Sequence, residues 1–225
     1  MNRNESLALV VLVLLSIRPG DSRADEAAVI KHLRSLGAKI TQDEKLVGNP
    51  VIGVDLLKTK VTDKDLKGLK ELKELQYLGL GRTKVTNEGL KELTELRRLT
   101  SLDLSLTDVT NAGVKELRPL AGRLRSLNLY YTKITNAGVK ELCSFEQLRD
   151  LDLSENDVSD AALEEIKGLK NLLRLDLSHT KITDAGLKHL QEMKHLERLN
   201  LNGTRATAEG ITDLKKALAK TRIDP

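Results

Sequence analysis

Residues 172–195 read LLRLDLSHTKITDAGLKHLQEMKH, and this stretch decides the fold because the chain repeats it. The other copies start at Leu75, Leu99, Leu124, Leu148 and Leu196, and a weaker first copy starts at Val51. Successive starts lie 24 residues apart, except for one step of 25 residues between the third and fourth copies. The extra residue falls near Pro119–Gly122, where a loop can absorb it. A fixed period of this length indicates a solenoid.

Each copy is expected to fold as one short strand and one short helix. Leu102 and Leu104 alternate with polar residues, so their side chains share one face of a strand. Thr183-Asp184 is a helix N-terminal signal, and apolar residues follow it at helical spacing. Neither element can bury its apolar face alone, so we expect neighbouring copies to bury them against each other. Glycines recur at one offset and should allow close approach between neighbouring turns: Gly89, Gly113, Gly138, Gly186 and Gly210.

The pattern resembles the leucine-rich repeat, L-x-x-L-x-L-x-x-N-x-L, from Val51 to about Leu218. Within that family it is similar to the short bacterial repeats ending T-D-x-G-L and to the cysteine-containing, ribonuclease-inhibitor-like class. Thr replaces Asn at the family's Asn position in every copy except that of Asn156. The resemblance implies an α/β solenoid: a right-handed horseshoe with a parallel sheet on its concave face and helices on its convex face.

The repeats lead to a division of the chain into three parts. Residues 51–225 are expected to form a domain of seven repeats, closed by a capping helix at Thr207–Lys220 and followed by a tail, Thr221–Pro225. Residues 25–50 are interpreted as an N-terminal cap, because residues 25–36 are amphipathic and Gly37 follows them. Ala38–Pro50 is expected to lead into the first strand.

Residues 1–24 have the layout of a secretory signal peptide. The apolar run Leu7–Ile17 is too short to span a bilayer comfortably, and Ser22-Arg23-Ala24 places small residues before a cleavage point at Asp25. The sequence therefore predicts export to the periplasm, cell surface or medium, with no stable membrane span after cleavage. An uncleaved anchor or a buried hydrophobic helix is the alternative.

Composition narrows the classes of function. The 37 basic and 33 acidic residues are interspersed, which is typical of a solvated surface and not of a nucleic-acid-binding one. Cys143 is the only cysteine, so an intramolecular disulfide cannot form, and its apolar surroundings predict a buried side chain.

Three features of the exposed sheet face are candidate partner-binding groups. The first is a polar column in which repulsion between like charges suggests a basic or hydrogen-bonding ligand, unless the column only keeps the face polar: Asp103, Asn128, Asp152 and Asp176. The second is the set of tyrosines, either a binding hot spot or a cover for apolar edges: Tyr77, Tyr130 and Tyr131. The third is the pair Arg174 and Arg198, which either clamp an anion or form ion pairs with Asp150 or Asp176.

No catalytic or metal-binding arrangement emerges from the sequence. His179 lies in the same region as these candidates and is included among them, next to Ser178 and near Asp176. Ser178 and His179 are adjacent and should diverge, and there is no nucleophile elbow, so a catalytic triad is not expected. The chain is expected to be a non-enzyme without cofactor or metal.

These observations predict an exported, non-catalytic module that binds a protein partner of unknown identity on the concave face. One alternative is a structural or adhesive envelope protein. A second is an intracellular adaptor, because this repeat type resembles the substrate-receptor repeats of ubiquitin ligases.

Overall fold

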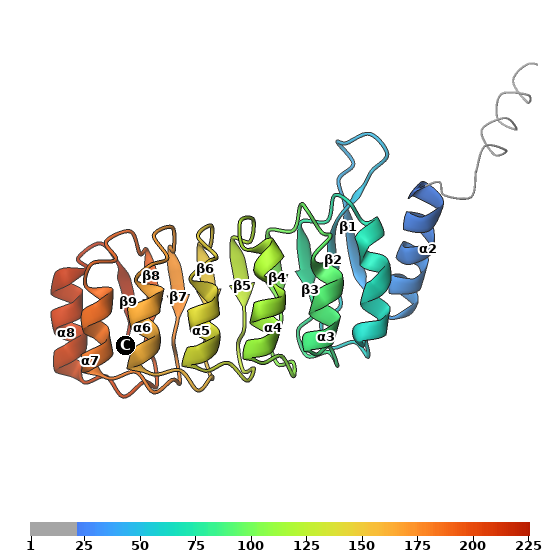
Figure 1. Cartoon of the computed structure of the whole chain (residues 1–225). Coiled ribbons are helices and arrows are strands. Elements are labelled where there is room, and N and C mark those ends of the chain that lie inside the picture. Colours follow the sequence, from blue (N-terminus) through green and yellow to red (C-terminus); the bar gives the residue numbers. More distant parts are fainter. Residues whose placement is uncertain (1–21) are drawn as a thin grey trace, which may run out of the picture.

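The computed structural model describes residues 22–225, and these form a solenoid around a nine-stranded sheet (Figure 1). The strands follow one another in sequence order across the sheet. They are β1 (Lys39–Gln42), β2 (Val51–Asp55), β3 (Tyr77–Gly79), β4 (Ser101–Asp103), β5 (Ser126–Asn128), β6 (Asp150–Asp152), β7 (Arg174–Asp176), β8 (Arg198–Asn200) and β9 (Arg222–Asp224). The pairs from β2 to β9 are parallel, and β1 pairs with β2 in the antiparallel sense.

Helical segments line one side of the sheet (Figure 1). The α-helices are α2 (Ser22–Ser35), α3 (Asn87–Leu90), α4 (Asn111–Glu116), α5 (Asn136–Leu142), α6 (Asp160–Ile166), α7 (Asp184–Leu190) and α8 (Ala208–Ala217). The 3₁₀ segments are η1 (Asp63–Glu71), η2 (Lys91–Leu93) and η3 (Arg118–Leu120). One strand and one helical segment per repeat confirm the α/β leucine-rich-repeat solenoid predicted from the sequence.

The core is one continuous cluster between the sheet and the helices. The middle residue of each strand from β3 to β8 is a leucine, and these leucines lie opposite one another without any register shift: Leu78, Leu102, Leu127, Leu151, Leu175 and Leu199. Each is fully or almost fully buried. A buried leucine side chain contributes about 1.5–3 kcal/mol relative to an exposed one, so this in-register stack is a major source of stability.

A tight turn with the same backbone conformation follows the strand of each repeat. Seven residues after each start, the backbone adopts a positive φ, at Lys58, Arg82, Leu106, Tyr131, Glu155, His179 and Gly203. The next residue is Thr in six copies, and its hydroxyl donates to the carbonyl three residues earlier, as Thr83 does to Leu80 at 2.7 Å. Asn156 does more, because its amide donates to three carbonyls, and its Oδ1 accepts from the Ile134 N–H. The single Asn therefore ties two repeats together.

A ladder of side-chain hydrogen bonds joins the helix starts of successive repeats. The first helical residue of one repeat, Asp or Asn, binds the Thr or Ser that caps the next helix. Asp160 accepts from the Thr183 N–H at 2.7 Å and from the Thr183 Oγ1 at 2.6 Å. Where the residue is Asn, its Nδ2 donates to the Thr instead, as Asn87 does to Thr110 at 3.0 Å. The remaining rungs are Asp63–Thr86, Asn111–Thr135, Asn136–Ser159 and Asp184–Thr207.

The ladder explains the recurrent glycines. A Cβ atom added at Gly113 would lie 2.5 Å from the Asn87 Oδ1 of the preceding repeat. The close approach expected at these glycines is therefore made by the Asp or Asn side chain of the preceding repeat. That side chain lies against the glycine and binds the Thr that caps the glycine's own helix. The fifth repeat has Ala162 at this position, so one copy accommodates a methyl group.

Both ends of the solenoid carry elements that the repeat pattern did not predict. Ala38–Pro50 was expected to be a connection, but it contains β1, which pairs along β2. Thr221–Pro225 was expected to be a tail, which was wrong, because β9 adds to the sheet through hydrogen bonds such as Leu201 N to Asp224 O at 2.8 Å. At the N-terminal end α2 packs against η1, and Leu33 is fully buried.

The predicted signal peptide, residues 1–24, lies outside the described residues except for Ser22–Ala24, which begin α2. Among the described helices, none has the length and apolar character needed to cross a bilayer.

The ladder yields a stability prediction. Asp160→Ala removes two hydrogen bonds to Thr183, and we expect it to lower the free energy of unfolding by about 1–3 kcal/mol, as loss of a charged acceptor does. Urea unfolding followed by circular dichroism measures the change.

The matched control for this prediction is Asp157→Ala, which removes a carboxylate three residues away. Asp157 forms an exposed ion pair with Lys181, and its loss should cost less than about 1 kcal/mol. Equal losses in the two variants would contradict a structural role for the ladder.

Candidate functional site

The polar column on the exposed sheet face has a structural role at the end of each strand. One side-chain oxygen of each Asp or Asn accepts the backbone N–H two residues later. In Asp103, Asp152 and Asp176 this bond is 2.9 Å long and comes from Ser105, Ser154 and Ser178. Asn128 and Asn200 make the equivalent bond. The offset is thus occupied by residues that stabilise the turn after the strand.

The second carboxylate oxygens differ along the column. Asp176 Oδ2 accepts from the Asn200 Nδ2 at 2.8 Å. Asp103 Oδ2 and Asp152 Oδ2 accept no hydrogen bond from residues 22–225. Two half-buried carboxylates therefore retain acceptor capacity on this face.

Burial raises the pKa of Asp152, and the negative charges of Asp176 and Asp103 raise it further. Hydrogen bonds from Ser154 act in the opposite direction. The ionised form of Asp152 is therefore less favourable than that of an ordinary Asp, and a nearby positive charge would relieve this cost.

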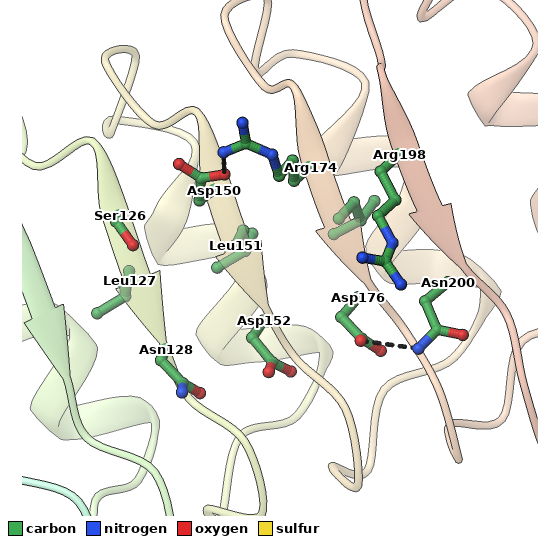
Figure 2. Close-up of a pocket in the computed structure, with 11 residues that line it drawn as sticks. Ser126, Leu127, Asn128, Asp150, Leu151, Asp152, Arg174, Asp176, Arg198 and Asn200 are labelled. Carbon is green, nitrogen blue, oxygen red and sulfur yellow. Dashed lines mark hydrogen bonds and ion pairs between the residues drawn. The ribbon is translucent and has the colours of Figure 1, made fainter. Parts of the chain in front are cut away.

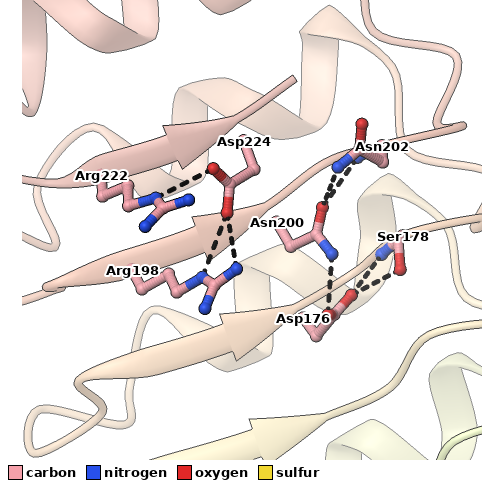
Figure 3. A network of polar contacts seen from close by, with 7 residues as sticks. All are labelled: Asp176, Ser178, Arg198, Asn200, Asn202, Arg222 and Asp224. Atoms are coloured by element: carbon pink, nitrogen blue, oxygen red, sulfur yellow. Dashed lines mark hydrogen bonds and ion pairs between the residues drawn. The ribbon is translucent and has the colours of Figure 1, made fainter.

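The two arginines of the candidate set are the first residues of β7 and β8, and each forms an ion pair with an acidic residue of the neighbouring strand. Arg174 donates to Asp150 Oδ1 at 2.5 Å (Figure 2). Arg198 binds Asp224 Oδ2 through Nε at 3.1 Å and Nη2 at 2.9 Å, and Arg222 binds the other oxygen of Asp224 (Figure 3). Of the two alternatives left by the sequence, the geometry has Arg174 paired with Asp150, whereas Asp224 was not foreseen as a partner.

A shallow hollow of about 340 Å³ lies over strands β5 to β8 (Figure 2), and we call it the β5–β8 hollow. It brings together five candidate residues: Asn128, Asp152, Arg174, Asp176 and Arg198. Ser126, Asp150, Asn200 and three leucines complete its lining. The arrangement offers carboxylates, amides and guanidinium groups side by side and suits polar recognition.

Tyr77 lies outside this hollow, near the N-terminal end of the sheet. Its hydroxyl lies 2.7 Å from the point that a Cβ of Gly79 would occupy, and Asp55 Oδ1 lies 2.8 Å from the same point. Burial raises the pKa of Tyr77, and the charges of Asp55 and Asp103 raise it further. The ring therefore extends along the polar column where Gly79 leaves a gap.

Tyr130, Tyr131 and His179 lie after the strand ends. The two tyrosine rings lie 6.0 Å apart and are tilted by 52°. Tyr131 and His179 both have positive φ angles, and the His179 ring covers Gly203. Ser178 donates to Asp176 at 2.6 Å, and within residues 22–225 His179 bonds to neither of them. The expected divergence of Ser178 and His179 agrees with this geometry.

Cys143 was expected to be buried, which was wrong: it is exposed at the end of α5. Burial of part of the side chain and a contact with Glu165 raise the pKa of its thiol to about 11. Its apolar neighbours in the sequence point inward from the helix, whereas Cys143 occupies the outward position after the last turn. The described residues contain no group of three or more metal-binding side chains.

The sequence missed two contributors to this face. Asp224 lay in the predicted tail, and the role of Asn200 as a donor to Asp176 requires the exact register of β7 and β8. Asn200 stands at the same column offset as Asp176 in the sequence, and one further step of 24 residues reaches Asp224, so continuing the column beyond the seventh copy would have found Asp224.

A model of Zer-1-like leucine-rich repeats matches residues 90–219, more than half of the chain. The chain belongs to this leucine-rich-repeat family. Leucine-rich-repeat proteins of this kind generally serve as protein-interaction modules and not as catalysts. A search of curated protein sequences found no match to this leucine-rich-repeat chain.

Two solved structures support the fold of the leucine-rich-repeat chain. Internalin C2 from Listeria monocytogenes is 22% identical, with a TM-score of 0.57, and the match covers 77% of this chain and 80% of internalin C2. A leucine-rich-repeat protein from Leptospira interrogans is 24% identical, with a TM-score of 0.50, and the match covers 71% of this chain and 45% of that protein.

The raised pKa of Asp152 gives a prediction about stability and pH. A folded-state pKa above the unfolded value means that ionisation opposes folding, and the penalty is fully present above the folded pKa and is lost at low pH. Asp152→Asn keeps the acceptor for Ser154 and removes the charge. We expect it to raise the free energy of unfolding at pH 7 by a few tenths to about 1 kcal/mol.

The gain should shrink as the pH is lowered into the acidic range, because the unsubstituted Asp152 then becomes protonated at a higher pH than an ordinary Asp. Urea unfolding at several pH values measures it. Asn128→Asp, which adds a charge between Asp103 and Asp152, should act in the opposite direction. A pH-independent effect of Asp152→Asn would refute repulsion as its cause.

Proposed function

We propose that this chain is an exported protein-binding module whose partner binds in the β5–β8 hollow on the concave face of the sheet. The observation that supports this most directly is the hollow itself, in which carboxylate, amide and guanidinium groups converge on an uncovered sheet face. Membership of the leucine-rich-repeat family supports a protein as the partner.

Charge in the hollow favours a particular kind of contact. Arg174 and Arg198 are engaged by Asp150 and Asp224, whereas Asp152 retains an oxygen without a partner among residues 22–225. A Lys or Arg side chain of the partner placed beside Asp152 and Asp176 would complete the hydrogen bonding. It would also compensate for the burial and the neighbouring negative charges that raise the pKa of Asp152.

The remaining candidates would extend the contact along the solenoid. Asp103 and Tyr77 continue the polar column towards the N-terminal end, and Tyr130, Tyr131 and His179 lie at the turns after the strands. Tyrosines combine apolar area with a hydroxyl and are enriched in binding hot spots.

A binding measurement tests the hollow. The double variant Asp152→Asn with Asp176→Asn keeps the turn acceptors and removes two charges, and we expect it to reduce crosslinked partner recovered from the cell envelope by at least about tenfold. The control, Glu164→Gln with Glu192→Gln, removes two exposed charges from the helical side. Unchanged recovery with the hollow variant, or an equal loss with the control, would exclude the hollow as the binding site.

Export is tested separately by cell fractionation with N-terminal sequencing. We expect the mature protein outside the cytosol, with Asp25 as its first residue, because residues 1–24 have the layout of a signal peptide. An intact Met1 in the cytosol would refute export and favour the intracellular adaptor.

A further inference from the structure

A second recess lies at the one irregular repeat, among the helix-to-strand loops that precede the strands. The copy that starts at Leu99 has 25 residues, and its end forms η3, with Pro119 in the first turn. Gly122 follows on the surface, where an added Cβ would meet no atom within 4 Å. The longer connection leaves space beside the loop of the preceding repeat.

This space is a recess of about 240 Å³ lined by three successive helix-to-strand loops, those before β4, β5 and β6. Four of its lining residues are Arg97, Arg98, Arg123 and Arg125, and Thr100 and Gln147 add polar groups. The backbone N–H of Arg125 donates to Thr100 O at 2.8 Å, which fixes the loops before β4 and β5 side by side. We call these six residues the arginine recess.

Acidic side chains within residues 22–225 neutralise little of the positive charge of these four arginines. Among residues 22–225, Arg98 alone of the four arginines has an acidic partner, Glu74, with 3.6 Å between Arg98 Nε and Glu74 Oε2. Arg123 donates to the Pro119 carbonyl at 3.1 Å. Arg97 and Arg125 make no side-chain hydrogen bond or ion pair within the described part of the chain.

The corresponding loops of other repeats differ in charge. The same positions include Glu74 in the first copy, Glu146 in the fourth and Glu197 in the seventh. The loops before β4 and β5 have four arginines and no acid at these positions. The positive charge is therefore concentrated where the irregular repeat opens the space.

We propose that the arginine recess binds a phosphate or sulfate group. A guanidinium presents a planar set of N–H donors that fits two oxygens of a tetrahedral oxyanion, and several arginines together can surround one group. Thr100 and Gln147 supply further donors at the same recess. The anion offsets the mutual repulsion of the guanidinium groups, so its binding stabilises the folded chain. This site does not depend on the proposed function of the β5–β8 hollow.

The test is an NMR titration of the arginine Nε–H resonances with inorganic phosphate, inorganic sulfate and glycerol phosphate at constant ionic strength, with sodium chloride as the reference salt. We expect the resonances of the recess arginines to follow a saturable curve with at least one oxyanion and to change little with chloride. Tighter binding of glycerol phosphate than of inorganic phosphate would identify a phosphate ester as the ligand class, and the reverse order would identify the free ion.

Arg97→Gln with Arg125→Gln removes two guanidinium groups that make no side-chain bond within residues 22–225, so folding should be retained. It should raise the dissociation constant by at least about tenfold. The control, Arg82→Gln with Arg205→Gln, removes two exposed arginines near the turns that follow the strands. This variant should leave the dissociation constant unchanged. Linear shifts that are equal for oxyanions and chloride, or equal weakening in the two variants, would overturn the proposal.

Discussion

Every strand from β3 to β7 places a leucine opposite the leucine of the next strand, without any shift of register. A repeat has too few apolar residues to form a core of its own, so it must stack against its neighbours to bury them. Stacking is favourable only if equivalent leucines meet, because a shift by one residue would turn the apolar side chains of a strand towards solvent. The register of this ladder therefore determines where every other side chain of the solenoid lies.

Because the register is fixed, the residues at one position of successive repeats lie side by side and form a column on the surface. The offset of Asp103 and Asp152 is used by residues that accept an N–H bond at the strand end, so one structural requirement recurs along the sheet. The column accumulates negative charge as a consequence, and burial together with this charge raises the pKa of Asp152. A structural device and a binding surface thus share the same side chains. The irregular repeat instead changes the surface at the helix-to-strand loops, where its longer connection contributes Arg123 to the arginine recess.

The sequence was sufficient for the fold because its signals recur in seven copies. The alternating leucines, the Thr-Asp helix starts and the glycines all appear in the structure at the predicted offsets. β1 and β9 were missed because neither contains the repeat motif, and their place follows from the open edges of the sheet. The burial of Cys143 was predicted wrongly, because at the end of a helix a shift of one residue turns a side chain from the core towards solvent.

The site was less predictable than the fold. Its columns followed from the period, but hydrogen bonds such as Asn200 to Asp176 depend on rotamers that a repeat pattern does not specify. The choice between an anion clamp and an ion pair likewise depended on whether Arg174 reaches Asp150. The arginine recess was not foreseen, because its four arginines belong to three copies and converge only where the loops lie side by side.

The ladder at the helix starts has two kinds of rung. They are Asn residues in the middle, at Asn87, Asn111 and Asn136, and Asp residues towards the two ends, at Asp63, Asp160 and Asp184. At the last rung, hydrogen bonds from Thr207 lower the pKa of Asp184, so the ionised carboxylate stabilises the folded chain at neutral pH. This contribution is lost when the pH falls far enough to protonate Asp184 in the folded chain, whereas an amide rung has no charge to lose. Acid therefore weakens the attachment of α8 to the repeat before it and leaves the Asn rungs around β4 and β5 in place.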